Sequence, residues 1–509
     1  MAIHLKFELD CRARRPGLAM TWEETRSPSE TFFARIALLP TGPVFQILSA
    51  MTPMPPRLLS RRDFIEHSGR LAAVSALAGV ALPHVHAAGS DLIRVALIGC
   101  GGRGTGAATQ ALSTTSGPIQ LVAMADVFAN RLASAHERLA KNPQVGKLVD
   151  VPPDRRFIGL DAYKSALDCL KPGDVAIFAT PLAFRGAHFA YAIAKGLHVF
   201  MEKPLTADGP TSKRMFALGE EASAKNLKVG VGLMCRHCQS RGELAQRIQD
   251  GQLGDILLMR AYRMHGPIGF FASPPKPADK TDLMYQIERF HSFMWSGGGA
   301  YSDFYIHNID ECSWMKGAWP VKAQSNGGRH FRGDSIDQNF DSYSTEFTYA
   351  DGTKLFLEGR CIAGCVNDHS STAHGTKGMA IISEKGHIPA RARIYKTQNA
   401  NPADLVWAFP QPEKNPYQLE WDNLIGAIRA DRPYNEVQRG VEASLVTSMG
   451  RMAAHTGQVI TYEQMLNCEH EFAPGVDTFT ADSPAPLQPD ASGKYPIPRP
   501  GIETKREYS

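Results

Sequence analysis

Short apolar segments alternate with helical segments between residues 92 and 234. The apolar segments have the length of β-strands and comprise residues 92–98, 119–125, 175–179, 197–201 and 229–234. Helical patterns follow the first of them at residues 105–112 and separate the third from the fourth at residues 188–195. Strands that alternate with helices are typical of a parallel, doubly wound sheet. The pattern therefore predicts an α/β domain over residues 91–234.

The pattern changes after residue 235. Strand-like segments occupy residues 255–264, 342–349, 354–363 and 378–383, and a helical pattern returns over residues 419–456. The sequence Ala350-Asp351-Gly352 is a hairpin turn signal between the second and third of these strands. These features predict a second, α+β domain over residues 235–470. Residues 471–509 are rich in Pro, Asp and Ser and predict an extended arm or a partly disordered tail.

A glycine-rich loop follows the first predicted strand. It reads Gly99-Cys100-Gly101-Gly102-Arg103-Gly104, which is a GxGxxG motif. The first glycine permits a tight turn, the second lets the backbone approach a pyrophosphate, and the third lets the helix pack on the strand. Phosphates would then lie at the positive N-terminus of the helix. Because a strand precedes the motif and a helix follows it, we predict a dinucleotide site.

Asp126 ends the second predicted strand, 22 residues after Gly104. An acid in this position accepts hydrogen bonds from the adenosine ribose and repels a 2′-phosphate. The cofactor is therefore expected to be NAD rather than NADP, although Arg131 nearby keeps NADP open. The alternative is a surface aspartate at the end of a strand.

Residues 51–88 have the order of a secretory leader. Arg61 and Arg62 precede a mildly apolar run at residues 71–82, and Val85-His86-Ala87 resembles a cleavage site. The run is too short to span a bilayer. We expect export through the twin-arginine route, a periplasmic location and no membrane association after cleavage; a buried helix is the alternative. Residues 1–50 fit no part of a leader and are expected to be a spurious or unstructured extension.

The composition excludes few classes of protein, but it narrows the range of expected binding partners. Across 509 residues the chain is 43% hydrophobic and 21% charged, with a formal net charge of +4, so it has the profile of a globular protein. No basic stripe favours nucleic-acid binding. Nine scattered cysteines argue against a disulfide framework. Cys235 and Cys238 form a CxxC without a second pair, so we expect packing cysteines and no metal site.

Several motifs together resemble the Gfo/Idh/MocA oxidoreductase family over residues 92–465. They are the glycine-rich loop, Glu202-Lys203-Pro204 at the end of residues 187–204, Asp303 and His307 after three glycines at 297–299, and Asp431-Arg432-Pro433 between two final helices. The resemblance implies an N-terminal Rossmann domain for NAD(P). It also implies a second domain with a large, mostly antiparallel sheet that forms a homo-oligomer interface.

The resemblance also implies roles that chemistry supports. Lys203 would project into the crevice of the nucleotide domain and stabilise a developing alkoxide. Asp303 and His307, four residues apart, would share a helical face, with His307 as general base and Asp303 orienting the substrate or the base. The expected cofactor contacts are the six loop residues 99–104, Asp126, Thr180, Pro181, Glu202, Lys203 and Arg236. Asp310 is a candidate support for His307, and His188, His237 and His265 are open between site and structure.

The expected substrate is a hydroxyl of a sugar, cyclitol or glycoside. Residues 266–295 are rich in aromatic side chains, which suit the apolar faces of sugars or simply cover the sheet. An exported enzyme would have no free NAD outside the cytoplasm, so the cofactor should stay bound and be recycled in place. Transhydrogenation between two sugars and redox-neutral glycoside cleavage both satisfy this requirement. A non-catalytic sugar-binding or sensor protein is the alternative of another class.

Overall fold

The computed structural model describes residues 91–508. The predicted leader and the extension before it therefore lie outside the described residues. Within the described part of the chain, no helix combines the length and apolar character needed to cross a membrane.

The first domain contains a six-stranded parallel sheet in the order β3-β2-β1-β4-β5-β6. Its strands are β1 (Ile93–Ile98), β2 (Ile119–Asp126), β3 (Arg156–Ile158), β4 (Val175–Phe178), β5 (His198–Met201) and β6 (Val229–Val231). All five pairings are parallel. This arrangement confirms the predicted doubly wound α/β domain. The sequence pattern missed only β3, which is three residues long and only partly buried.

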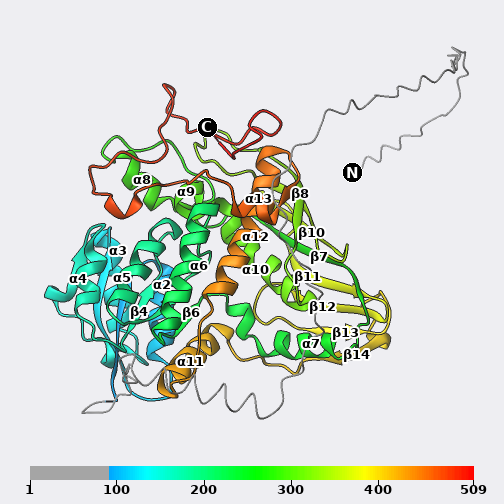
Figure 1. Ribbon diagram of the computed structural model, residues 1–509, viewed down its shortest axis with the longest axis horizontal. Helices are drawn as coiled ribbons and strands as arrows, with labels where there is room; N and C mark the ends of the chain where they lie inside the picture. Colours follow the sequence, from blue (N-terminus) through cyan, green and yellow to red (C-terminus); the bar gives the residue numbers. More distant parts are fainter. Residues whose placement is uncertain (1–90, 509) are drawn as a thin grey trace, which may run out of the picture. The chain divides into compact units, whose positions relative to one another are not determined.

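Helices cover both faces of this sheet (Figure 1). They are α2 (Gly102–Leu112), α3 (Ala129–Ala140), α4 (Ala162–Asp168), α5 (Arg185–Ala194) and α6 (Gly209–Ala224). Two later helices, α11 (Pro416–Arg429) and α12 (Val437–Thr456), add apolar side chains to the cores of this domain. Trp421 of α11, for example, packs on Phe200 of β5 with ring centroids 4.4 Å apart. The end of the chain thus returns to the first domain.

The second domain contains a nine-stranded sheet in the order β14-β13-β12-β11-β7-β10-β9-β8-β15. Its strands are β7 (Ile256–His265), β8 (Lys322–Gly328), β9 (Ser342–Thr348), β10 (Lys354–Cys361), β11 (Asp368–Gly375), β12 (Gly378–Glu384), β13 (Arg393–Tyr395), β14 (Leu405–Ala408) and β15 (Ile460–Thr461). Only β7 and β10 pair in parallel. The sheet is therefore mostly antiparallel, as expected, and β9 and β10 form the predicted hairpin.

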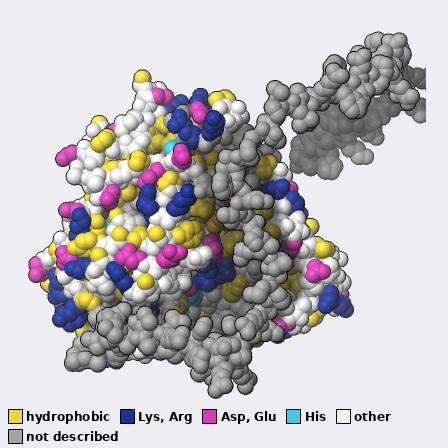
Figure 2. Space-filling model, in the orientation of Figure 1, with side chains coloured by type: hydrophobic (Ala, Val, Ile, Leu, Met, Phe, Trp, Pro, Cys, Tyr) yellow, Lys and Arg dark blue, Asp and Glu magenta, His cyan; other side chains and the backbone are white. Residues whose placement is uncertain are grey.

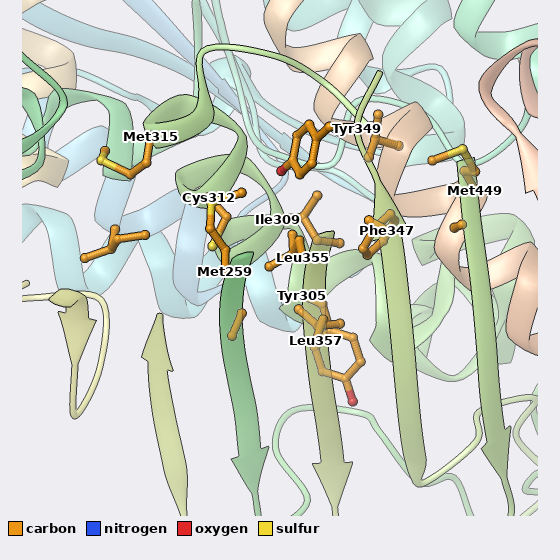
Figure 3. Close-up of a cluster of buried hydrophobic side chains, with 14 of the residues drawn as sticks. Met259, Tyr305, Ile309, Cys312, Met315, Phe347, Tyr349, Leu355, Leu357 and Met449 are labelled. Carbon is orange, nitrogen blue, oxygen red and sulfur yellow. The ribbon is translucent and has the colours of Figure 1, made fainter. Parts of the chain in front are cut away.

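One face of the large sheet is covered by α10 (Gly299–Lys316) and α12. Figure 3 shows the packing: Tyr305, Ile309 and Cys312 of α10 point toward apolar side chains of the strands. Met259 of β7 and Leu355 of β10 lie in the same cluster and are fully buried. The shorter helices are α7 (Gln239–Gln249), α8 (Asp282–Glu288), α9 (Met294–Gly297) and α13 (Tyr462–Leu466). Nearly all of α10 is buried, including the residues at its start, so the side chains there are enclosed by packing.

The chain after α13 is extended over the surface, with one short 3₁₀ turn, Val476–Thr478. Its end turns inward, and Glu507 and Tyr508 are buried. Arg451 of α12 donates to both carboxylate oxygens of Glu507, at 2.8 to 3.2 Å. The tail is thus an arm anchored at its end. On the face shown in Figure 2, Lys and Arg side chains are interspersed with Asp and Glu over the described residues.

Candidate active site

A cavity of about 670 Å³ lies at the carboxyl ends of the parallel strands. Residues that follow β1, β2, β4, β5 and β6 line it, together with side chains of α10 and of the segment before α10. Ligands bind at this edge in open parallel sheets, because the loops leaving the strands diverge there. The cavity brings together most of the residues predicted as site residues.

The glycine-rich loop forms one end of the cavity. Gly99 has a φ of +93°, and a side chain at Gly104 would place its Cβ 1.9 Å from the Gly99 carbonyl oxygen. By contrast, a Cβ at Gly101 or Gly102 would meet no atom within 4 Å. The turn is therefore tight on its protein side and open toward the cavity, where α2 begins. Such an open helix N-terminus fits a pyrophosphate.

Asp126 lies at the end of β2 and lines the same cavity. Its carboxylate accepts hydrogen bonds from the backbone N–H groups of Cys100, at 2.6 Å, and Phe128, at 2.8 Å. Burial raises the pKa of Asp126, although these N–H groups oppose the shift. A carboxylate has about four acceptor positions, so Asp126 keeps capacity for ribose hydroxyls. Arg131 is also at the cavity, but it donates to the Glu288 carbonyl at 3.1 Å.

The Arg103 side chain turns away from the loop toward two acids. It donates to Glu202 at 2.5 Å and to Glu420 at 3.2 Å, and it lies over the Tyr417 ring. Burial, followed by the charge of Glu202, raises the pKa of Glu420 well above its usual range. Arg103 therefore contributes its backbone to the loop, while its guanidinium ties the loop to α11.

Thr180 and Pro181 follow β4 and line the middle of the cavity. The Thr180 carbonyl accepts a hydrogen bond from Arg185 at 2.7 Å, and the same guanidinium donates to the Pro204 carbonyl. His188 lies within 3.3 Å of the Thr180 hydroxyl. Burial, followed by the charge of Arg185, lowers the pKa of His188 to about 3, so this histidine is neutral. The structure thus places His188 in the cavity wall.

Lys203 follows β5 and reaches across the cavity to α10. Its ammonium group donates to the Asp303 main-chain carbonyl at 2.7 Å and to Asp303 Oδ1 at 3.0 Å. An ammonium group has three donors. Two are used within the described residues, and the third remains available to a ligand.

Asp303 and His307 lie one turn apart on α10, and both line the cavity, as predicted. Burial alone would raise the pKa of Asp303, but Lys203 and His291 outweigh it and hold that pKa well below its usual range. Asp303 is therefore a carboxylate at neutral pH. Burial, followed by the charges of Lys203 and Arg263, holds the pKa of His307 well below its usual range. Its imidazole is therefore neutral and can accept a proton.

Comparison with known families agrees with this geometry. Residues 93–233 match the GFO_IDH_MocA oxidoreductase family with an NAD-binding Rossmann fold, and residues 242–381 match the GFO/IDH/MocA C-terminal domain. The two matches together span more than half of the chain. The chain belongs to the GFO/IDH/MocA family of oxidoreductases. Its first domain is accordingly an NAD-binding Rossmann domain.

Several curated relatives are named for reactions on a sugar nucleotide or a cyclitol. A dTDP-3,4-didehydro-2,6-dideoxy-alpha-D-glucose 3-reductase of Actinomadura kijaniata is 31% identical over 127 residues, which is 25% of this chain and 32% of the relative. The scyllo-inositol 2-dehydrogenase (NAD(+)) of Bacillus subtilis is 24% identical over 289 residues, covering 56% of this chain and 76% of the relative. For the first three relatives the match spans 32% to 48% of their length, which is less than half.

Solved structures of other proteins share the fold of this chain. The aldose-aldose oxidoreductase of Caulobacter crescentus, complexed with glycerol, has a TM-score of 0.56 at 17% identity, covering 72% of this chain and 99% of that chain. The scyllo-inositol dehydrogenase of Lactobacillus casei, with bound NAD(H) and scyllo-inositol, has a TM-score of 0.52 at 19% identity, covering 73% and 99%. At these identities the likeness concerns the fold alone.

His291 is a cavity residue that sequence reasoning placed only in an aromatic loop. Its Nε2 lies 3.2 Å from Asp303 Oδ2. No motif marks this position, because the contact joins a loop residue to a helix that begins eight residues later in the chain.

Arg236 is not among the residues that line the cavity, contrary to its predicted role in binding the cofactor. Its guanidinium donates to both carboxylate oxygens of Asp310, at 2.8 to 3.0 Å, and lies over the Trp314 ring. Asp310 consequently bonds Arg236, and the expected support of His307 by Asp310 is wrong. The physical reason is that Asp310 is fully buried and needs a cationic partner.

His237 and His265, the other open candidates, are also absent from the cavity wall. His237 lies 3.3 Å from Glu436, and the His265 ring lies 2.7 Å from the Gly266 carbonyl. Both histidines have structural partners at these positions.

The cysteines of the described residues are free thiols. Cys235, His307 and His387 present donor atoms within 4.8 Å of one another, which is a spacing suited to a metal ion. His387 Nε2, however, lies 3.1 Å from the Arg263 guanidinium. This positive charge opposes a cation, and the expectation of no metal stays a prediction.

Proposed function

We propose that this member of the GFO/IDH/MocA family oxidises a secondary hydroxyl of a sugar, cyclitol or sugar derivative with NAD. One observation carries the proposal: Lys203, the Asp303 carboxylate and the neutral His307 meet in one cavity with the glycine-rich loop. The names of the curated relatives support this class of substrate.

The residues present fit the cofactor. Gly101 and Gly102 leave open space beside the start of α2 for the pyrophosphate, and Asp126 is placed for the ribose. The carboxylate of Asp126 supports a preference for NAD over NADP, since it would repel a 2′-phosphate. When bound, NAD supplies the acceptor for the hydride that leaves the substrate carbon.

Side chains of the protein stabilise the negative charge that develops on the substrate oxygen and accept the hydroxyl proton. The third N–H of Lys203 donates to the substrate oxygen, and its positive charge stabilises the negative charge that develops there. Asp303 stays ionised and holds the ammonium group in place. His307 is neutral and receives the hydroxyl proton. Both oxygens of Asp303 are occupied, by Lys203 and His291, and its pKa is held well below its usual range, so Asp303 is assigned the role of orienting Lys203.

The test combines bound cofactor with turnover. Denatured protein should release NAD, and the native protein should reduce NAD with scyllo-inositol, myo-inositol or D-glucose. Lys203→Ala should lower kcat by about 100-fold or more, because it removes the charge that stabilises the alkoxide. Lys195→Ala is the matched control, since Lys195 forms an ion pair on the surface with Asp168. Retained sugar binding, with no turnover in the wild type and no effect of Lys203→Ala, would favour a sugar-binding protein instead.

We propose further that the cofactor is held tightly and recycled in place. This proposal rests on the predicted twin-arginine leader, which would export the folded protein to the periplasm. The net reaction would then be transhydrogenation between two sugars or redox-neutral cleavage of a glycoside. A pair of aldoses should yield one oxidised and one reduced product in the first case. A p-nitrophenyl glycoside should release p-nitrophenol without net NADH in the second.

Mature protein still reaching the periplasm after Arg61→Lys with Arg62→Lys would refute export by the twin-arginine route.

Self-association through the nine-stranded sheet is also proposed. The proposal rests on the resemblance to the Gfo/Idh/MocA family, which implies an interface at this sheet. Leu257 of β7, which is 57% exposed on the described surface, is the position used to test it. Light scattering should show a smaller particle for Leu257→Glu than for the wild type, and an unchanged mass would exclude this face.

A further inference from the structure

His291 lines the cavity and contacts the carboxylate that binds Lys203. It lies in a 3₁₀ turn, Phe290–Ser292, that precedes α10. Asp303 Oδ1 accepts from Lys203 at 3.0 Å, and Oδ2 lies 3.2 Å from His291 Nε2. The two oxygens of one carboxylate therefore serve two different side chains.

The backbone sets the tautomer of His291. The N–H of Phe270 donates to His291 Nδ1 at 3.1 Å, so Nδ1 must be an acceptor. In the neutral ring the proton is then on Nε2, which is the nitrogen that faces Asp303. Gly269 permits this approach: its φ is +55°, and a Cβ there would lie 2.7 Å from His291 Nδ1.

The main chain of His291 is connected to the start of α10 by hydrogen bonds. The buried Asn339 side chain donates to the His291 carbonyl at 2.9 Å and accepts from the Ala300 N–H at 2.8 Å. One side chain thus fixes both the turn that carries His291 and the first turn of α10. The ring packs on Phe290, with centroids 4.0 Å apart, and on Phe304, at 5.4 Å.

We propose that His291 is a positioning residue that acts on Lys203 through Asp303; this inference rests on the proposed function. While His291 holds Oδ2, only Oδ1 and the main-chain carbonyl of Asp303 are bound to the ammonium group. The third N–H of Lys203 stays directed to the substrate oxygen. Without His291 the carboxylate is free to rotate and offer both oxygens to Lys203, which competes with the substrate for that third donor.

Two variants separate the hydrogen bond from the packing. His291→Phe keeps a ring and removes both nitrogens, while His291→Gln keeps an N–H that can reach Asp303. With scyllo-inositol, myo-inositol or D-glucose, whichever the wild type oxidises, His291→Phe should lower kcat about 10-fold or more, because it removes a hydrogen bond to a charged group. His291→Gln should recover part of the loss. The NAD content and Tm should match those of His374→Phe, a control at a histidine of the large sheet that bonds Gln398.

A double-mutant cycle decides whether His291 acts through Asp303. In an Asp303→Asn background, His291→Phe should change kcat by less than about 2-fold, because the carboxylate it holds is gone. An undiminished 10-fold loss in that background would overturn the proposal.

The proposed function fails separately, if the wild type binds NAD but oxidises none of these polyols. The His291 contact then has its own readout in ¹⁵N spectra of histidine-labelled protein. The resonance lost in His291→Gln should show the Nε2–H tautomer, and its ring shifts should change in Asp303→Asn. An Nδ1–H tautomer or unchanged shifts would overturn the inference without reference to turnover.

Discussion

Removing the charge of Glu507 should strongly destabilise the protein, although this residue is close to the end of the chain. Its carboxylate accepts three hydrogen bonds from Arg451, at 2.8 to 3.2 Å, and lies 2.6 Å from His455 Nδ1. Arg451 and Glu507 are both buried. Glu507→Gln would leave the guanidinium in the interior without its counter-charge.

Two independent routes give a similar magnitude. Breaking a buried ion pair by removing one partner typically costs about 3–5 kcal/mol. Burial alone would raise the pKa of Glu507, but Arg451 and His455 lower it from 4.5 to about 2. That difference corresponds to about 3 kcal/mol of stability at neutral pH. Because the folded pKa is depressed, the contribution is fully present above about pH 4.5 and is lost as the pH falls toward 2.

Urea unfolding followed by tryptophan fluorescence measures the effect. Glu503→Gln is the matched control, because Glu503 pairs with Arg499 four residues away on the exposed part of the same tail. An exposed pair of this kind contributes about 0.2–1 kcal/mol. The free-energy difference between Glu507→Gln and the wild type should shrink as the pH is lowered from 4.5. Equal costs for the two variants at pH 7, or a cost of Glu507→Gln that does not depend on pH, would refute the reasoning.

Three further predictions concern the cofactor and the base. Gly104→Ala should abolish NAD retention, because its Cβ would lie 1.9 Å from a carbonyl oxygen. Gly426→Ala is the control, because its Cβ would meet no atom within 4 Å. Denaturation should release NAD from the control variant and none from Gly104→Ala. Asp126→Asn should raise the affinity for NADP relative to NAD by about 10-fold, measured by fluorescence titration, since it removes the charge that repels a 2′-phosphate. The pKa of His307 is depressed, so the acidic limb of kcat/KM should lie below pH 6.5; a limb above pH 6.5 would contradict a neutral His307.

The nucleotide domain could be predicted because the burial of its strands is visible in the sequence as apolar segments. Strands of a parallel sheet are covered on both faces and read as continuous apolar runs. The strand β1 follows this rule, with five of six residues buried. In the second sheet, β8 (KAQSNGG) and β11 (DHSSTAHG) are polar along most of their length, and no periodicity distinguished them from loops.

The candidate site divides along the same line. Lys203, Asp303 and His307 belong to the motifs that resemble the Gfo/Idh/MocA family, and this resemblance implied that they share one site. Spacing alone placed only Asp303 and His307 on one face of a helix. The contacts of Arg236 could not be predicted, because its partner Asp310 is 74 residues away in the chain. Asp310 also lies one turn after His307, so a contact with His307 was the more obvious expectation. Local spacing places residues on a helix face, but the charge of a neighbouring element decides which of them pair.

The supports of Lys203 and Asp303 are distributed so that turnover and stability can be separated. Arg451 donates to the Ser302 hydroxyl at 2.6 Å and to the Ala207 carbonyl at 2.6 Å. Ser302 precedes Asp303, and Ala207 lies four residues after Lys203, so Arg451, which Glu507 of the tail binds, contacts the chain close to both members of the ion pair. The His291 ring, by contrast, is bonded to the Asp303 carboxylate through Nε2 and to the Phe270 N–H through Nδ1. A loss at Glu507 should therefore affect both the fold and the turnover, whereas a loss at His291 should affect turnover alone.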